Sequence, residues 1–355
     1  MSRRTLTFSV AGILTVILVV LGAVLPVPYV ILVPGPVCDT LGSCYGRTVV
    51  SVSGTATAGQ ATSGHLFLTT VGVVPGSCTA HPTLFQALRA WFDHTEAVEP
   101  HQVICPPGQS NQQVQQQNAH EMTQSQQDAV TAALLQLGYH PSSTRIIATD
   151  VAAGTPAAKV LRAGDAILAV DGQPVSTLPR LHALISAHRP GQSVTLTIRR
   201  AGRQQQVSVQ TFDSGGRTLI GIDDLDLQAS FTAAKTPKVR LGLNPDDVGG
   251  PSAGLMFTLG IIDKLTPGSL TGGRSIAGTG TIDGFGTVGV IGGIQQKIAG
   301  AERHGATVFL VPAGDCADAK AVAPKSMTLV KVDTLKTALS ALAAIRAGST
   351  AFPRC

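Results

Sequence analysis

The sequence predicts an α+β multidomain protein with an N-terminal transmembrane helix, a β-rich domain and a C-terminal α/β domain. Three observations lead to this fold class. The chain has 355 residues, which is enough for two or three domains with a sizeable core. Residues 5–33 contain no charged side chain. From about residue 218 onwards, strand and helix patterns alternate, as they do in layered α/β or α+β domains.

The charge-free stretch predicts a helix that spans a membrane. A spanning helix needs about 20 apolar residues, and residues 5–25 supply them before Pro26 and Pro28 stop the helix. Arg3 and Arg4 precede the stretch, which predicts a cytoplasmic N-terminus. A cleaved signal peptide is the alternative. An uncleaved anchor is favoured because the stretch is long and no good small-x-small cleavage site precedes the prolines. In either case the remaining residues are expected outside the cytoplasm, and with the uncleaved anchor the protein is expected at the cell membrane.

Six cysteines agree with that location, because an even number of thiols outside the cytoplasm usually forms disulfides. Pairing in sequence order gives Cys38–Cys44, Cys78–Cys105 and Cys316–Cys355. Sequence alone leaves this connectivity open. A metal site is the alternative for the "CTAH" stretch at 78–81 and the "HQVIC" stretch at 101–105, with His94 between them. The spacing matches no strong zinc pattern and oxidation would consume the thiols, so disulfides are favoured and no metal is expected.

The charge distribution gives little support for nucleic-acid binding. The formal net charge is only +5, and the densest basic group is the short stretch 197–203. No stripe of interleaved aromatic and basic residues accompanies it. Nucleic acid is therefore not expected as a partner.

Residues 34–140 link the membrane stretch to the rest of the chain. Residues 47–74 alternate and are rich in Val and Thr, which predicts two or three strands. Apolar side chains at helical spacing predict a short helix near Trp91. The glutamine-rich stretch 109–127 indicates a solvated helix or loop. A helix capped by Ser125 is expected to follow it.

Residues 141–215 are predicted to form a separate β-rich domain. The stretch "GTPAAKVLRAGDAILAVDGQPV" at 154–175 resembles bacterial PDZ domains. That resemblance implies a groove in which an extended peptide is added to a sheet edge. The walls would be the strand that carries Ile146 and Ile147 and the helix that carries Leu181 and Ile185. A packing module without a ligand is the alternative.

The stretch "NPDDVGGPSAG" at 244–254 places Ser252 directly before an almost wholly apolar run. Ser252 is expected to open a buried helix, where free N–H groups and the helix dipole would stabilise an oxyanion. The amides near Gly250 and Ser252 are the expected oxyanion donors, because glycine leaves the backbone unhindered. A serine that only caps the helix would have the same local structure, so the two interpretations stay open at this point.

Lys297 is a candidate base for Ser252. On a helix through "IQQKIAGAERHGA" at 294–306, it falls on the edge of the apolar face, while Gln296 and Arg303 point away. Burial would lower the pKa of its ammonium from about 10.4 towards roughly 7 to 8, which makes a neutral amine available. A lysine whose tip reaches water is the alternative. A histidine-based triad is weak, because His304 is the only histidine after Ser252 although "GPSAG" fits G-x-S-x-G.

The motifs "GPSAG" and "IGG-(x)3-K", 45 residues apart between Ser252 and Lys297, resemble the proteolytic domain of the Lon family. The resemblance implies a Ser–Lys dyad in which Ser252 is the nucleophile and Lys297 the base. Thr279 falls where the family has a threonine that supports the lysine. Two departures matter. Gly249 stands where the family often has an acidic residue, and the chain has no G-x(4)-G-K-[ST] phosphate loop.

The order of anchor, PDZ unit and proteolytic unit resembles the membrane-anchored, PDZ-containing Lon-like proteases of Gram-positive bacteria. This implies domains at 1–33 (cytoplasmic tip and anchor), 34–140 (a segment that could join the protease fold), 141–215 (PDZ) and 216–355 (Lon-like). It also implies an ATP-independent serine endopeptidase, without cofactors, that acts on flexible or unfolded protein segments outside the cytoplasm. A homo-oligomer is compatible with the family. The alternative is a catalytically inactive PDZ scaffold or chaperone that binds peptide termini at the membrane surface.

Overall fold

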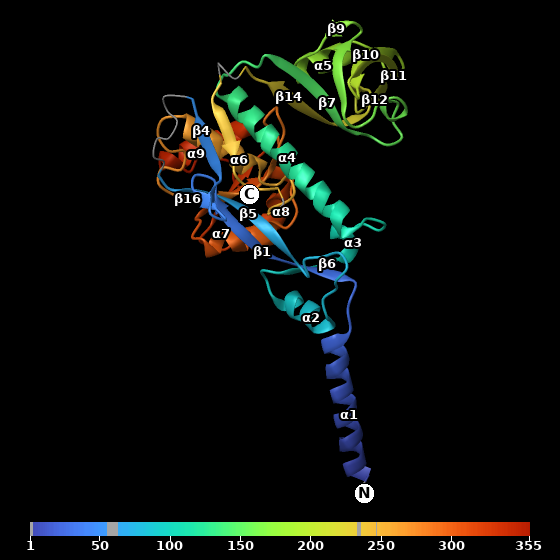
Figure 1. Cartoon of the computed structure of the whole chain (residues 1–355), viewed down its shortest axis with the longest axis vertical. Helices are drawn as coiled ribbons and strands as arrows, with labels where there is room; N and C mark the ends of the chain where they lie inside the picture. Colours follow the sequence, from blue (N-terminus) through green and yellow to red (C-terminus); the bar gives the residue numbers. More distant parts are fainter. Residues whose placement is uncertain (1–2, 55–62, 233–235, 246) are drawn as a thin grey trace.

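The computed structural model describes residues 3–54, 63–232, 236–245 and 247–355. Helix α1 (Arg3–Val24) extends away from the rest of the molecule (Figure 1). Its residues 7–24 have a mean hydropathy of 2.5, and only 6% of that stretch is buried. The helix is therefore long and apolar enough to cross a membrane or to serve as a signal sequence.

A six-stranded sheet forms the centre of the molecule, in the order β20-β19-β16-β5-β1-β6. Neighbours from β20 to β5 are parallel, and β1 runs antiparallel to both β5 and β6. The strands are β1 (Tyr29–Asp39), β5 (His65–Val74), β6 (Ala97–Pro100), β16 (Ser275–Gly278), β19 (Val308–Pro312) and β20 (Thr328–Val332). Strands from residues 29–100 thus complete a sheet whose other half comes from the last third of the chain.

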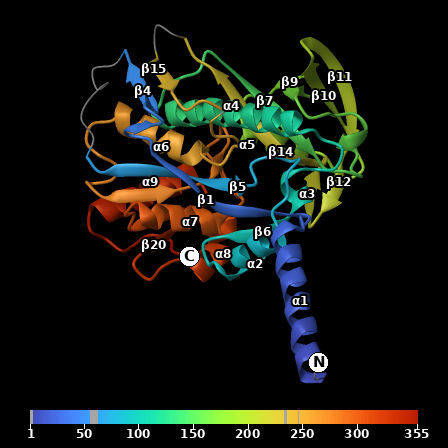
Figure 2. The ribbon, with the colours of Figure 1, turned by 60° about the horizontal axis from the view of Figure 1, so that its bottom comes forward.

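Helices cover both faces of this sheet, because successive strand residues point to opposite sides. On β19, Val308 and Leu310 belong to one core, and Phe309 and Val311 belong to the other. The first core is covered by α4 (Asn111–Gln136), α6 (Gly254–Leu265) and α9 (Leu335–Arg346). The second is covered by α7 (Ile294–Arg303) and α8 (Cys316–Val322). Figure 2 shows α4 and α6 on one side of β1 and β5 and α7 on the other.

A second sheet lies at the end of the molecule opposite α1 (Figure 1) and has the order β11-β10-β8-β7-β14. Helix α5 (Leu178–Ser186) and the short strand β9 (Gln173–Pro174), which pairs with β8, belong to the same unit. Its strands are β7 (Ser143–Val151), β8 (Asp165–Val170), β10 (Ser193–Arg200), β11 (Arg203–Gln210) and β14 (Ile222–Ser230). The expected boundary at 215–216 falls inside this unit, because β14 pairs with β7 along its length.

Shorter elements complete the fold. Strand β15 returns from the second sheet and pairs with β4 beside the central sheet. The remaining elements are β2 (Ser43–Cys44), β3 (Arg47–Thr48), β4 (Val50–Ser53), α2 (Leu84–Phe92), α3 (His101–Ile104), β12 (Phe212–Ser214), β13 (Arg217–Leu219), β15 (Lys238–Leu241), β17 (Thr281–Ile282) and β18 (Val288–Gly289), with 3₁₀ turns at Ala157–Lys159 and Ala313–Asp315.

The glutamine-rich stretch is helical and belongs to α4, whose N-cap is Ser110 and not Ser125. The Ser110 hydroxyl accepts a hydrogen bond from the Gln113 amide, and the Gln113 side chain accepts one from the Ser110 amide. This reciprocal cap starts the helix 15 residues earlier than the sequence pattern predicts. Ser125 lies inside the helix and is buried against α6.

The structure joins the cysteines in three disulfides, and these are the pairs expected from sequence order: Cys38–Cys44, Cys78–Cys105 and Cys316–Cys355. Cys78 and Cys105 are therefore bonded to each other, and neither presents a thiolate to a metal ion. The His101 ring instead donates to the backbone oxygen of Cys78 at 3.1 Å. The Cys316–Cys355 bond ties the last residue to α8.

Candidate active site

Ser252 lies in a turn two residues before α6, so it does not open the helix as expected. Every residue of α6 except Lys264 is buried, which fixes the turn against the central sheet. Gly254, at the start of the helix, has no room for a side chain. A Cβ there would come within 2.9 Å of the Ser125 hydroxyl and of the Ile282 side chain. The serine is half-buried and its turn is therefore held closely against α4 and β17.

Lys297 lies on α7 and is only 3% exposed. The helix packs against β1 and β5, which cover the side that the sequence pattern assigned to solvent. For the same reason Gln296, expected to point away from the core, is 1% exposed. The periodicity within α7 could not show these strands, because they come from residues 29–74. Lys297 is thus a core lysine, and its tip does not reach water.

Thr279 connects Lys297 with the turn of Ser252. The Nζ atom of Lys297 donates to the Thr279 hydroxyl at 3.2 Å, and that hydroxyl donates to the backbone oxygen of Ser252 at 3.0 Å. The Gly280 amide donates to the same oxygen at 2.9 Å. Thr279 directly follows β16, a central strand between β5 and β19, so its position is rigid. Three segments far apart in sequence therefore meet at one buried polar contact.

Burial lowers the pKa of Lys297 to about 7, because a charged ammonium is disfavoured away from water. The carboxylate of Asp315 opposes this change by attracting the ammonium. Asp315 itself is held by the Ile291 amide at 3.1 Å, and its own pKa is raised by burial. Near neutral pH a substantial fraction of Lys297 is a neutral amine, which can accept a proton.

Two other groups considered from the sequence, the Gly250 amide and the His304 ring, are already engaged. The Gly250 amide, an expected oxyanion donor, instead donates to the backbone oxygen of Asn118 on α4 at 3.0 Å. This is a correction to the expected site, because the turn lies directly against α4, where a Cβ at Gly249 would come within 2.7 Å of the Asn118 side chain. The His304 ring bonds the backbone oxygen of Gly300 at 2.9 Å, one turn back on α7. It is therefore occupied within its own helix.

Helix α4 supports the serine turn, and this contribution was missed from sequence. In addition to the contact between Asn118 and Gly250, the Ser125 hydroxyl donates to the backbone oxygen of Pro251 at 2.9 Å. Both residues lie in the glutamine-rich stretch, which has no chemical motif. The only available signal was the buried face formed by Met122, Ala129 and Ala133, seven and four residues apart.

If Lys297 acts as the base of a hydrolytic reaction, removing the Thr279 hydroxyl is expected to slow that reaction. A hydrogen bond to a charged group contributes about 1.5–3 kcal/mol, so Thr279→Val should lower kcat about 10- to 100-fold. It should also shift the acidic limb of the pH–rate profile to lower pH, because the oxygen that accepts from the lysine favours the ammonium form. Thr279→Ser keeps the hydroxyl and should restore both values. A valine variant with an unchanged profile would exclude contact between Thr279 and the reacting base.

Comparison with known families agrees with this geometry. Residues 235–344 match the model of the Lon protease (S16) C-terminal proteolytic domain, and residues 114–211 match the model of the PDZ domain. The chain carries a Lon-type proteolytic domain and a PDZ domain. In the structure, the Lon-type domain also includes strands β1 and β5, which lie outside the matched residues. The PDZ sheet likewise continues beyond the matched residues to β14.

Individual relatives support the same assignment over short stretches. The Lon protease of Clostridioides difficile (strain 630) is 34% identical over 93 residues, which are 26% of this chain and 11% of that protein. Lon protease 1 of Sorangium cellulosum (strain So ce56) is 37% identical over 105 residues, which are 29% of this chain and 12% of that protein. The chain thus spans only a small part of the length of these two relatives.

Among solved structures, the PDZ domain of an SdrC-like protein from Listeria monocytogenes is 26% identical, with a TM-score of 0.21. The match covers 22% of this chain and 84% of that one. A solution structure from Geobacillus thermodenitrificans is 27% identical with a TM-score of 0.20, covering 21% of this chain and 84% of that one.

The PDZ domain has a groove, but the expected strand does not form its wall. Ile146 and Ile147 lie on β7, which is paired with β8 on one side and β14 on the other, so β7 has no free edge. The edge strand is β14, and a pocket of about 630 Å³ is lined by β14, α5 and the β12–β13 hairpin. Leu181 and Ile185 of α5 line the pocket opposite Ile222 of β14.

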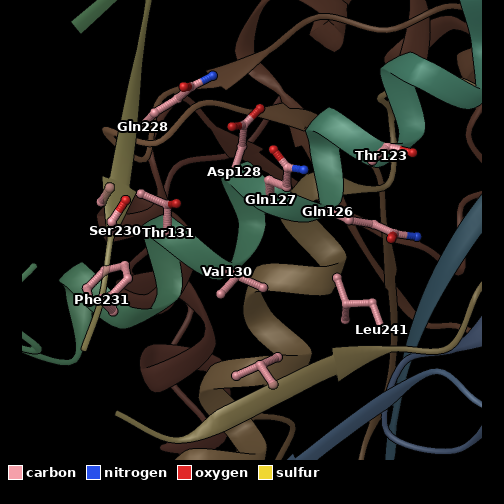
Figure 3. A pocket seen from close by; sticks show the side chains of 12 residues that line it. Thr123, Gln126, Gln127, Asp128, Val130, Thr131, Gln228, Ser230, Phe231 and Leu241 are labelled. Atoms are coloured by element: carbon pink, nitrogen blue, oxygen red, sulfur yellow. The ribbon is translucent and has the colours of Figure 1, made fainter. Parts of the chain in front are cut away.

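A further pocket of about 520 Å³ lies between the two domains and is shown in Figure 3. It is lined by α4, β14 and β15, with Gln126 and Asp128 on the helix and Gln228 and Ser230 on β14. Neither Ser252 nor Lys297 lines it. This pocket marks the junction of the PDZ and Lon-type domains and is separate from the candidate dyad.

Buried carboxyl groups join the two domains beside this pocket. Asp226 on β14 accepts the Gly284 amide at 2.9 Å, and Gln124 donates to both Asp128 and Asp226 at 2.8 and 3.3 Å. Burial, followed by the charge of Asp226, raises the pKa of Asp128 to about 8. A second proton-binding group with a pKa near neutrality therefore lies at the domain junction.

Proposed function

We propose that this protein is a serine endopeptidase that works without ATP and is anchored in the cell membrane by α1. Ser252 is the nucleophile and Lys297 the general base. The proposal rests chiefly on one observation: a core lysine with a pKa near 7 is connected through Thr279 to the turn that carries Ser252. Matches to the Lon proteolytic family support the same reaction class.

In the proposed reaction, the Ser252 hydroxyl attacks the carbonyl carbon of a peptide bond. Neutral Lys297 accepts the hydroxyl proton, and the resulting ammonium later returns that proton to the leaving amine. Because Nζ already donates one hydrogen to Thr279, the amine lone pair remains available for the serine proton. Water then hydrolyses the acyl-enzyme in a second round of the same proton transfers.

The oxyanion formed in this reaction needs backbone donors. Between residues 250 and 255, the amides of Gly250, Gly254 and Leu255 donate to the backbone oxygens of Asn118, Pro251 and Gly280. Proline has no N–H group. The amides of Ser252 and Ala253 are therefore the proposed donors in this turn.

The proposed substrates are flexible or unfolded segments of proteins outside the cytoplasm. No G-x(4)-G-K-[ST] phosphate loop occurs in the 355 residues, so the proposal includes no ATP-driven unfolding. The free edge of β14 beside α5 suits an extended peptide, which would add to the PDZ sheet as a strand. Three disulfides support a site outside the cytoplasm.

Cleavage of an unfolded protein by the full chain in lipid nanodiscs tests the proposal. Wild type should cleave without nucleotide, and Ser252→Ala should lower the rate about 10³-fold or more, as loss of a nucleophile does. Ser208→Ala, at an exposed position on β11, is the matched control and should cleave like wild type. Equal cleavage by Ser252→Ala would exclude the dyad. Peptide binding without any cleavage by wild type would favour an inactive PDZ scaffold.

A further inference from the structure

Helix α2 is fixed to the end of α1. The Val27 amide donates to the Pro82 oxygen, and the Leu84 amide donates to the Leu25 oxygen, both at 3.0 Å. Gly22 of α1 lies so close to the Phe85 ring that a Cβ there would come within 2.5 Å of it. Figures 1 and 2 show α2 beside the end of α1, at the base of the central sheet. The two helices therefore move together.

The large apolar side chains of α2 face outwards. Ala87 and Ala90 form its buried side. Its exposed side carries four large apolar residues, with exposed fractions of 43% for Phe85, 45% for Leu88, 72% for Trp91 and 85% for Phe92. Positions 85, 88 and 92 lie on one helix face. This is the reverse of a helix on a soluble protein, which turns its large apolar residues towards the core.

The exposed face of α2 continues the apolar surface of α1. The last residues of α1 and the next residue are also exposed, with Leu21, Val24 and Leu25 at 50%, 70% and 49%. Tyr29 follows at 39%. A bilayer crossed by α1 has its water interface at this end of the helix, where tryptophan and tyrosine are enriched in membrane proteins. The exposed aromatic residues thus lie at the level that favours them.

The few charges on and around α2 indicate which part of the membrane its exposed face contacts. The one cation on α2, Arg89, forms an ion pair with Glu96 at 2.8 Å, and Asp93 follows the helix directly. No cluster of basic residues accompanies the exposed face in "LFQALRAWFDHTEAVE" at 84–99. Attraction to anionic headgroups therefore has little part here, and burial of apolar side chains in the acyl boundary is the driving force.

We propose that α2 lies in the membrane interface, with Phe85, Leu88, Trp91 and Phe92 inserted among the lipids. This inference rests on the proposed anchoring by α1. Insertion of α2 gives the protein a second attachment point on the membrane. Helix α2 is followed by β6 (Ala97–Pro100), which pairs with β1 of the central sheet. The interfacial helix thereby sets the height and orientation of the Lon-type domain above the bilayer. With α1 alone, that domain would be free to rotate relative to the membrane.

Trp91 is the only tryptophan in the chain, so its fluorescence reports directly on α2. The test places the full chain in phosphatidylcholine vesicles whose acyl chains are brominated near the headgroup. Interfacial helices bury their apolar face about 5–10 Å into the headgroup boundary, so Trp91 emission should be weaker than in the same vesicles without bromine. The loss should not change with salt. In the control, Trp91→Phe with Gln205→Trp on the exposed face of β11, emission should stay unquenched.

Vesicle flotation separates the possible failures. If the protein leaves the vesicles in alkaline carbonate, anchoring by α1 is wrong and the inference falls with it. If the protein stays on the vesicles and Trp91 is unquenched, anchoring stands and the interfacial position of α2 is wrong. If Trp91 is unquenched, with blue-shifted emission that reverts when the protein is diluted into excess lipid, a second copy of the chain covers α2 and the lipid assignment is overturned.

Discussion

Replacing Lys297 with methionine is expected to abolish cleavage and to stabilise the fold. Burial lowers the lysine pKa from 10.5 to about 7, which corresponds to about 5 kcal/mol between the two protonation states. Because the folded-state pKa is the lower one, this cost is absent above about pH 10.5. It grows as the pH falls and is nearly complete at pH 7. Methionine fills a similar space without a charge.

The expected gain at pH 7 is about 2 kcal/mol or more, after the loss of the hydrogen bond to Thr279. Urea unfolding of the full chain at pH 7 and pH 9 measures it, and the gain should shrink at pH 9. Lys264→Met is the matched control on α6, where the lysine donates to the Leu41 oxygen at 2.9 Å. That variant should keep its activity. An active Lys297→Met variant would overturn the assignment of Lys297 as the base, and a destabilised variant would show that the lysine has a structural role.

A second large effect is the loss of activity at low pH. In the proposed reaction, the neutral amine of Lys297 accepts the serine proton, and the pKa of Lys297 is about 7. Below that pH, kcat/KM should fall about tenfold per pH unit and reach about one hundredth of its plateau at pH 5. Asp315 is the acidic group that faces Lys297, and it keeps the pKa from falling further. Cleavage of a fluorogenic peptide from pH 5 to pH 9 measures the profile.

The carboxyl group of Asp128 also titrates near neutrality, so it requires its own control. Asp128→Asn keeps the size of the side chain and its contact with Gln124 but does not titrate. If Lys297 is the base, the acidic limb should remain near pH 7 in this variant. A limb that disappears in Asp128→Asn would instead assign the pH dependence to the junction between the PDZ and Lon-type domains.

The local features of the candidate site could be predicted from the sequence. Short motifs placed Ser252 before an apolar helix and Lys297 on the apolar edge of another. Family resemblance added Thr279, which bonds the lysine in the structure. The predictions for Ser252 and Lys297 depend on side chains within a few residues of one another. Such spacings decide which face of a helix or strand is apolar, whatever the rest of the chain does.

Predictions that depended on distant segments were less accurate. The groove was assigned to the strand of Ile146, whereas the sheet edge is β14, more than 70 residues later in the chain. Gly250 was expected to bind the oxyanion, whereas α4 takes its amide. In both cases the prediction failed because of backbone hydrogen bonds, those between β7 and β14 and that from Gly250 to Asn118. Almost every residue type can form such bonds, so the sequence does not indicate which residues pair.

The apolar span, the serine and lysine motifs and the even set of cysteines can all be recognised from residue types and spacings. Tertiary structure alone decided that Lys297 is buried, because the strands that cover it come from residues 29–74 and pair with a sheet built more than 200 residues later. The lysine pKa follows from that burial. The sequence gives the chemical type of a side chain, but the exposure of that side chain to water depends on every segment that packs around it.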